Sequence, residues 1–405
     1  MQDNAECCTV VHVMKITVWG VNYAPELTGI APFNTTLCEH LAIRSHDVTM
    51  VTAFPYYPEW KKRAGDVNSC FRSENANGVT VHRCWLYVPR KLSALRRIAH
   101  EGSFVITSLF RILTLERPDL YIIVSPPLLL GVAAWIAGRI KHAPHVFHVQ
   151  DLQPDAAIGL GMLHFGMLTK ILYWIESFSY SKAARVSGIS RGMLEMFQKK
   201  GVPKEKVVYF PNGVKLSNVA VASGAFRSRL GIPEERFVAL YSGNLGVKQG
   251  LDILIEAADL LESNNIPGKV SGNSSRSVLI VISGDGSRKD ALADSIRMRK
   301  LRNVILLPLQ SDQAYREMLA DADCAVITQQ QGTGSFFFPS KLLTSLSAGK
   351  PVLTVADESS ELASACRDGG FGINVLPNQP AELASALCAL AKLRTEAAYP
   401  AHHEI

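Results

Sequence analysis

Several segments of this sequence carry residues that could bind an anion or a sugar, and each lies where an apolar, strand-like run gives way to a helical pattern. In "FFFPSKLLTSLSAGKPVL", Pro339 and Ser340 precede Lys341 at the predicted start of a helix. Proline is favoured in the first helical turn. A lysine there opposes the helix dipole, at a cost of about 0.3 kcal/mol or more. An anionic ligand would explain Lys341 better than a purely structural role.

Two further glycine turns follow strands in the second half of the chain. In "YSGNLGVKQGLD", glycines bracket Asn244, and Lys248 precedes the next helix. Backbone N–H groups and one cation in such a loop can bind phosphate, although the Walker A spacing is absent. In "SGDGSRKD", Gly284 and Gly286 could lie against a planar base or a ribose, or could simply form a turn between a strand and a helix.

The first half of the chain offers two weaker candidates. Gly29, in "NYAPELTGIAPFN", would let the backbone approach a ligand near a helix N-terminus, or it is only a turn glycine. "HVFHVQDLQPDAA" places His148, Asp151 and Asp155 at the end of a strand. A carboxylate there can accept hydrogen bonds from sugar hydroxyls or take a proton. Alternatively, Asp151 caps the next element and the histidine is an ordinary strand residue.

The elements that position these residues alternate along the whole chain. Short β-branched runs such as "KITVWGV" and "DVTMVTA" are separated by helical patterns such as "FNTTLCEHLAIRS". Near-continuous apolar strands favour parallel sheets covered on both faces. The pattern restarts after a polar stretch. We therefore expect an α/β protein with two doubly wound, Rossmann-like domains facing across a cleft, with ligands at the carboxyl ends of the strands.

The expected boundaries divide the 405 residues into five parts. An N-terminal extension (1–13) precedes a first doubly wound domain (14–205). A linker (206–225) leads to a second doubly wound domain (226–392), and a short tail (393–405) ends the chain.

The net charge of +6 is unevenly distributed. Residues 1–205 hold 22 Lys and Arg against 16 Asp and Glu, whereas residues 206–405 hold 20 of each. Much of the excess lies in the segment 90–117, whose apolar residues recur at helical spacing. This pattern predicts either a basic amphipathic helix that attracts an anionic membrane surface or a core helix with a solvated basic face. No motif accompanies the charge that would indicate nucleic-acid binding.

The eight cysteines are scattered and show no metal-ligand spacing. We expect reduced thiols in a cytoplasmic protein, with possible peripheral attachment at the inner face of the membrane. The longest apolar run, 128–138, is too short to span a bilayer.

Taken together and in order, several segments resemble a known family. They are "GIAPFNTTLCEHL", "HVQDLQPDAAIGLG", "IESFSYSKAARVSGISRGM", "FPNGV", "GNLGVKQGLDILIEA", "GDG" and "FPSKLLTSLSAGKPV". The family is that of the family-four retaining glycosyltransferases of the two-domain B-type fold, and the likeness is to its bacterial exopolysaccharide branch, which includes colanic-acid biosynthesis. The resemblance runs from about Lys15 to Leu390. It implies transfer of a hexose from a nucleotide-sugar donor, with retention of configuration, to an acceptor that is a lipid-linked saccharide.

The resemblance implies that residues 14–205 form the acceptor-side domain and residues 226–392 the nucleotide-sugar-binding domain. It also implies roles for individual residues. Asp151, Lys248 and Lys341 would form the catalytic set, with Asp151 facing a sugar and the lysines the phosphates. His148 and Asp155 would lie on the acceptor side. No metal or cofactor is needed if lysines and helix N-termini neutralise the leaving diphosphate. The remaining donor contacts would come from Gly29, Asn244, Gly284, Gly286, Pro339 and Ser340.

Three departures from the family pattern leave donor specificity and activity open. Phe336 and Thr344 stand where many members have a Glu-x7-Glu pair, and Asn244 with Lys248 replaces an Arg-then-Lys pair. The ending "RTEAAYPAHHEI" suggests a shortened C-terminus. Two alternatives therefore stand beside a transferase: a nucleotide-sugar epimerase or phosphorylase of the same fold, and a non-catalytic paralogue that scaffolds a polysaccharide-assembly complex.

Overall fold

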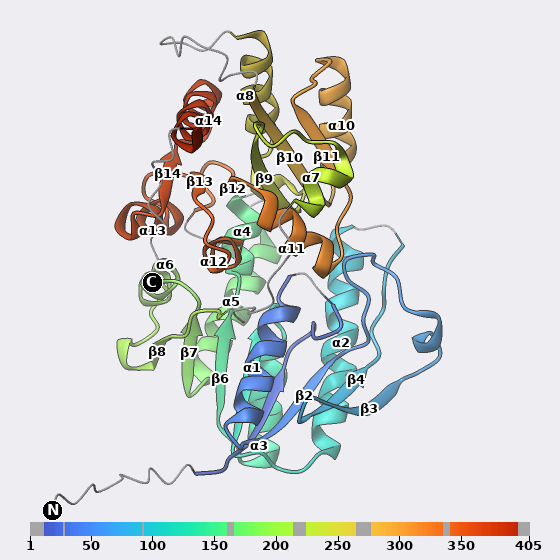
Figure 1. Ribbon diagram of the computed structural model, residues 1–405. Coiled ribbons are helices and arrows are strands. Elements are labelled where there is room, and N and C mark those ends of the chain that lie inside the picture. Colours follow the sequence, from blue (N-terminus) through green and yellow to red (C-terminus); the bar gives the residue numbers. More distant parts are fainter. Residues whose placement is uncertain are drawn as a thin grey trace, which may run out of the picture. The chain divides into compact units, whose positions relative to one another are not determined.

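The chain forms two α/β units, each built on its own sheet (Figure 1). The structure is a computed structural model that describes residues 12–26, 29–90, 93–159, 166–213, 224–264, 277–334 and 341–395. The first unit contains residues up to Gln150 together with 170–188 and 197–210, and the second contains the rest. The expectation of two doubly wound domains is confirmed.

The first unit has an eight-stranded sheet in the order β3-β4-β2-β1-β5-β6-β7-β8. All neighbouring strands are parallel except β3 and β4, an antiparallel hairpin closed by Asn77 and Gly78. Both turn residues have positive φ, as a two-residue hairpin turn requires. The strands are β1 (Lys15–Trp19), β2 (Asp47–Ala53), β3 (Phe71–Ala76), β4 (Val79–Cys84), β5 (Leu120–Ser125), β6 (His145–Val149), β7 (Arg185–Gly188) and β8 (Val207–Tyr209).

The helices of this unit connect its strands by crossovers. Helix α1 (Ala31–Ile43) connects β1 to β2, toward the β3 edge of the sheet. Helices α2 (Ala94–Thr114) and α3 (Leu130–Lys141) connect β4 to β5 and β5 to β6, toward the β8 edge. Right-handed crossovers therefore put α1 on one face and the other two on the opposite face. Helix α5 (Met167–Lys182) packs closely on α3, because a Cβ at Gly131 would lie 2.2 Å from the Ser179 hydroxyl oxygen.

The second unit has a six-stranded, fully parallel sheet in the order β11-β10-β9-β12-β13-β14. Its strands are β9 (Phe237–Asn244), β10 (Val278–Asp285), β11 (Val304–Leu307), β12 (Cys324–Thr328), β13 (Val352–Val355) and β14 (Gly372–Val375). Its helices are α4 (Gln153–Gly159), α7 (Ala225–Leu230), α8 (Asp252–Ser263), α10 (Lys289–Met298), α11 (Asp312–Asp321), α12 (Lys341–Ser347), α13 (Glu361–Gly369) and α14 (Pro380–Thr395). A short 3-10 turn, η3 (Val247–Gln249), follows β9.

Alternation along β9 builds a core on each face of this sheet. Phe237, Ala239 and Tyr241 belong to the larger cluster, which includes residues of α8 and α14. Val238 and Leu240 belong to the other cluster, which includes residues of α7 and α11. Successive side chains of a strand point to opposite faces, so the apolar run of β9 supplies both cores.

The unit boundaries differ from the sequence expectation. Residues 151–169 and 189–196 group with the second unit, although the sequence pattern placed all of 14–205 in the first domain. The carboxylate of Glu361 accepts hydrogen bonds from the backbone N–H groups of Arg191 (2.9 Å) and Gly192 (3.2 Å), at the start of α6 (Arg191–Lys199). These contacts tie the segment to α13, which sequence order alone does not reveal.

The C-terminal boundary also differs. Helix α14 continues to Thr395, beyond the expected domain end at 392. Arg394 forms an ion pair with Asp323 (3.0 Å) and donates a hydrogen bond to the carbonyl of Glu234 (2.8 Å). Residues 1–11 of the expected extension, 214–223 of the linker and 396–405 of the tail lie outside the described residues.

Candidate functional site

The carboxyl end of β9 lies at the topological switch point of the second sheet. Strand β9 is the first of this sheet in the chain and has β10 on one side and β12 on the other. Its register with β10 extends to the pair Asn244–Asp285, whereas its register with β12 covers only Ala239 and Leu240. Open α/β sheets bind ligands at the carboxyl ends of strands at such a point.

Three glycines allow the backbone to approach closely here. Gly243, Gly284 and Gly286 have φ of 137°, 156° and 154°, values that other residues rarely adopt. A Cβ at Gly284 would lie 1.8 Å from the carbonyl oxygen of Gly243, and one at Gly286 would lie 2.5 Å from that of Leu245. The ends of β9 and β10 therefore form a close-packed edge without side chains at these positions.

Lys341, the first residue of α12, extends over this edge. Its Nζ donates a hydrogen bond of 2.5 Å to the Tyr241 hydroxyl and lies 3.8 Å from the centroid of that ring. A Cβ at Gly243 would lie 2.3 Å from the Lys341 Cε. The lysine thus occupies space that exists only because residue 243 is a glycine.

The electrostatic environment of Lys341 is unfavourable for a cation. Burial of the ammonium group, and secondly the nearby charge of Lys248, lower the pKa of Lys341 to about 7. Among the described residues, no carboxylate forms an ion pair with Lys341. Two cations near one sheet edge are the arrangement that a bound anion would stabilise.

The structure brings together most of the donor residues expected in the second half of the chain. The Asn244 side chain is exposed, and its Oδ1 would lie 2.7 Å from a Cβ at Gly286. Lys248 lies in η3, and its carbonyl accepts a hydrogen bond from Gln330 N (2.9 Å). Thr344 lies on α12. Phe336, Pro339 and Ser340 lie outside the described residues.

The remaining expected residues belong to other segments of the chain. Gly29, in the first unit, has a φ of 68°, and a Cβ there would lie 3.6 Å from the Tyr57 ring. Asp151 and Asp155 group with the second unit. Asp151 is half-buried just before α4, and Asp155 lies in the first turn of that helix.

His148 is a fully enclosed strand residue. Its Nδ1 lies 2.9 Å from the Ser187 hydroxyl, and its Nε2 lies 2.8 Å from the side-chain nitrogen of Gln150. Burial lowers the pKa of His148 to about 4, which keeps the ring neutral at neutral pH. Because both ring nitrogens have partners within the core, the geometry favours the ordinary strand-residue interpretation over contact with an acceptor.

Tyr241 is the residue of this site that the sequence analysis missed. It is fully buried, and its hydroxyl donates a hydrogen bond of 2.7 Å to the carbonyl of Asn244. Burial raises the pKa of Tyr241 well above its usual range, so the hydroxyl stays protonated. An aromatic residue in an apolar strand looks like any core residue in the sequence, and its only distinguishing signal is its place two residues before Gly243.

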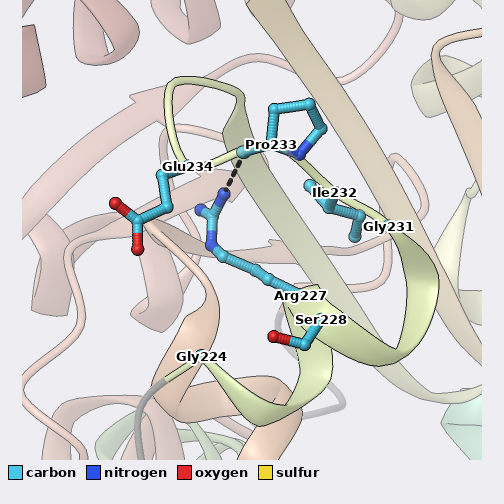
Figure 2. Close-up of a pocket in the computed structure, with 7 residues that line it drawn as sticks. All are labelled: Gly224, Arg227, Ser228, Gly231, Ile232, Pro233 and Glu234. Atoms are coloured by element: carbon cyan, nitrogen blue, oxygen red, sulfur yellow. Dashed lines mark hydrogen bonds between the residues drawn. The ribbon is translucent and has the colours of Figure 1, made fainter.

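A separate pocket in this unit is lined by α7 and the turn that follows it (Figure 2). The guanidinium of Arg227 donates hydrogen bonds to the carbonyls of Pro233 (3.0 Å) and Arg236 (2.9 Å) and pairs with Asp323 (2.7 Å). Arg227 therefore supports the turn, and its donors are directed at the protein.

Across the ranges that the structure describes, no three His, Cys, Asp or Glu side chains group as metal ligands.

Comparisons with known proteins place the chain in a family. Residues 28–213 match the model of a glycosyl transferase 4-like domain, and residues 223–401 match glycosyl transferases group 1. A colanic acid biosynthesis glycosyl transferase of Escherichia coli K12, WcaI, is 36% identical over 385 residues, which cover 92% of this chain and 91% of that protein.

Solved structures show the same fold at low identity. HepE of Anabaena, solved in complex with UDP, has a TM-score of 0.64 at 18% identity and covers 95% of this chain and 92% of its own. WaaG, a glycosyltransferase involved in lipopolysaccharide biosynthesis, has a TM-score of 0.62 at 17% identity and covers 95% of both chains. The chain therefore belongs to the group 1, family-four glycosyltransferases with the B-type fold, the family that its sequence motifs resemble.

Proposed function

We propose that this glycosyltransferase moves a hexose from a nucleotide-sugar donor to a lipid-linked saccharide, with retention of configuration, in bacterial exopolysaccharide or cell-surface polysaccharide biosynthesis. The likeness to the colanic acid enzyme supports the polysaccharide assignment. The UDP complex of HepE supports a nucleotide donor. Neither likeness specifies the base or the sugar.

The observation that carries this proposal is the position of Lys341. Its ammonium group lies over the glycine edge at the switch point, and the charge of Lys248 acts on it. A diphosphate at this edge would meet two cations beside the carboxyl-end turns of β9 and β10. Cations that are already in place stabilise the charge that develops on a leaving diphosphate.

In the proposed reaction, the bond between the anomeric carbon and the phosphate oxygen breaks, and a bond from that carbon to an acceptor oxygen forms. Attack on the face from which the diphosphate leaves retains the configuration. The departing phosphate takes the acceptor's proton, while Lys248 and Lys341 balance its negative charge. Asp151 would orient a sugar hydroxyl, and no metal is required if the lysines supply the positive charge.

We further propose that the first unit attaches to the inner membrane surface through α2. Four apolar side chains on one side of this helix are exposed: Leu95 (80%), Ile98 (47%), Ile106 (64%) and Phe110 (69%). Phe104 and Ile112, on the other side, are buried. The outer face is therefore more apolar than the expected basic face. In the first turn of the helix, Arg97 pairs with Glu101 (3.2 Å). Within the described ranges, no helix has the length and apolarity that spanning a bilayer requires.

The assay of this function measures sugar transfer from GDP-, UDP- and dTDP-sugars to membrane lipid extracts, with and without a chelator. We expect a lipid-linked product with the donor's anomeric configuration and no loss of activity with chelator. Donor conversion without acceptor would indicate an epimerase. A folded protein that neither transfers nor hydrolyses any donor would indicate a non-catalytic scaffold.

The phosphate assignment is tested by Lys341→Ala and Lys248→Ala. Each change removes the ammonium group that is proposed to donate a hydrogen bond to a phosphate oxygen. We therefore expect the affinity for inorganic pyrophosphate to fall about tenfold or more, with little loss of stability. Calorimetric titration measures the affinity, and thermal unfolding measures the stability. Lys300→Ala is the matched control, because Lys300 is exposed and precedes β11, at the opposite end of the strands. An unchanged affinity in either lysine variant would show that its assignment is wrong.

A further inference from the structure

We propose that Tyr241 is a positioning residue of the donor site, whose hydroxyl holds the ammonium group of Lys341 at the place where the phosphate binds. The inference rests on the proposed function, because it takes Lys341 to be the phosphate ligand. It concerns a residue that neither the sequence motifs nor the family matches single out.

The Tyr241 hydroxyl has two partners that together fix its orientation. It donates its proton to the carbonyl of Asn244 (2.7 Å), which leaves a lone pair to accept from Lys341 Nζ (2.5 Å). Lys341 lies 100 residues further along the chain. The hydroxyl therefore links the first residue of α12 to the end of β9, next to the asparagine expected at the donor.

The ring of Tyr241 limits the movement of the lysine further. Nζ lies 3.8 Å from the ring centroid, within the range of a cation–π contact. The ring itself is fixed, because Tyr241 belongs to the buried cluster that includes Leu245 and Leu251. On the side of Gly243, the missing side chain provides the room that the Lys341 methylenes occupy. A flexible lysine is thus restrained at its tip and along its stem.

This arrangement has a functional consequence. A free lysine must lose rotamer freedom when it binds a ligand, and this loss opposes binding. A lysine that already lies over the site incurs less of that cost on binding. The groups that act on its charge are Tyr241 of β9 and Lys248 of η3. Their arrangement holds the Lys341 side chain at the edge before the anion arrives, and a bound anion would favour its charged form.

The test is a double-mutant cycle on pyrophosphate binding. Tyr241→Phe keeps the ring and removes only the hydroxyl, and Lys341→Ala removes the ammonium group. We expect Tyr241→Phe to weaken binding about threefold to tenfold in the wild-type background, because it removes the restraint on Lys341 and no direct contact with the ligand. In the Lys341→Ala background, the same change should have no further effect, because the tyrosine acts through the lysine.

Tyr315→Phe is the matched control. Tyr315 is a half-buried tyrosine on α11 that packs against the core cluster containing Val238 and Leu240. Its replacement should leave pyrophosphate affinity unchanged in both backgrounds. Urea unfolding of each variant establishes that only folded protein is compared.

The outcomes separate the inference from the function on which it rests. If Lys341→Ala weakens binding but Tyr241→Phe does not, or if their losses add, the positioning role is refuted and the phosphate assignment stands. If Lys341→Ala itself leaves binding unchanged, both are refuted.

Discussion

Burial, and secondly the charge of Lys248, lower the pKa of the Lys341 ammonium group to about 7. At neutral pH this group is therefore only partly protonated. The side chain is only half-buried as a whole, but its charged end lies over an aromatic ring and beside the glycine edge. The fold holds this lysine where its positive charge is disfavoured, so a bound anion would stabilise the charged form. A structural lysine would gain more by reaching water or a carboxylate.

The lowered pKa of Lys341 also predicts how stability depends on pH. The folded state loses this proton near pH 7, whereas the unfolded chain keeps it up to about 10.5. Between these values the unfolded state binds more protons, so the contribution of Lys341 to the free energy of unfolding rises with pH. In phosphate-free buffer, urea unfolding between pH 7 and 9 should show a smaller rise for Lys341→Met than for wild type. The control, Lys300→Met, should follow wild type, and parallel curves for Lys341→Met would contradict a desolvated ammonium group.

At the scale of elements, the site depends on how closely β9 and β10 approach at their carboxyl ends. The register pairs Gly243 with Gly284 and Asn244 with Asp285. Leu245 N continues the contact by donating to the carbonyl of Asp285 (2.8 Å). The two turns are thus one packed unit, and a side chain in either would separate the strands.

This close packing predicts a large effect for Gly284→Ala. The new Cβ would lie 1.8 Å from the Gly243 carbonyl oxygen, a backbone atom that cannot rotate away. We expect a loss of about 3 kcal/mol or more in the free energy of unfolding, measured by denaturant titration. Gly349→Ala is the control, because Gly349 has a φ of 65° but no neighbouring atom within 4 Å. Its cost should be only the roughly 1–2 kcal/mol of the left-handed conformation, and equal losses would show that the strand ends can separate freely.

At the scale of the whole molecule, the net positive charge and most of the exposed large apolar side chains of the described residues belong to the first half of the chain. The excess of basic residues lies within residues 1–205, and the apolar outer face of α2 belongs to the first unit. The sequence analysis attributed membrane attachment to the basic residues of the segment 90–117. The exposed apolar side chains add a contribution that salt does not screen.

This distribution predicts how variants bind vesicles that contain phosphatidylglycerol. Leu95→Glu with Phe110→Glu should reduce co-sedimentation at both low and high salt, because it removes apolar contact. Charge reversal at Arg96 and Arg97 should reduce it mainly at low salt. The control, Ile43→Glu, changes an equally exposed residue (78%) at the end of α1, on the other face of the sheet. If the α2 variants sediment like wild type and like the control, α2 is only a structural helix.

Local sequence patterns predict the order of strands and helices along the chain, the two doubly wound domains and the glycine turns around Asn244 and Gly284. These follow from local periodicity and from backbone conformations that glycine favours. The sequence also contains a hairpin signal, Asn77–Gly78, which predicts the turn between β3 and β4.

Contacts between residues far apart in the chain become visible only in the folded structure. The contact of Lys341 with Tyr241 spans 100 residues, and that of Glu361 with Arg191 spans 170. No local pattern encodes such pairs, because they depend on how strands order in the sheet and how helices pack on it. The same reason explains His148: its sequence neighbours placed it with two acids, whereas burial and its bonds to Ser187 and Gln150 make it part of the core.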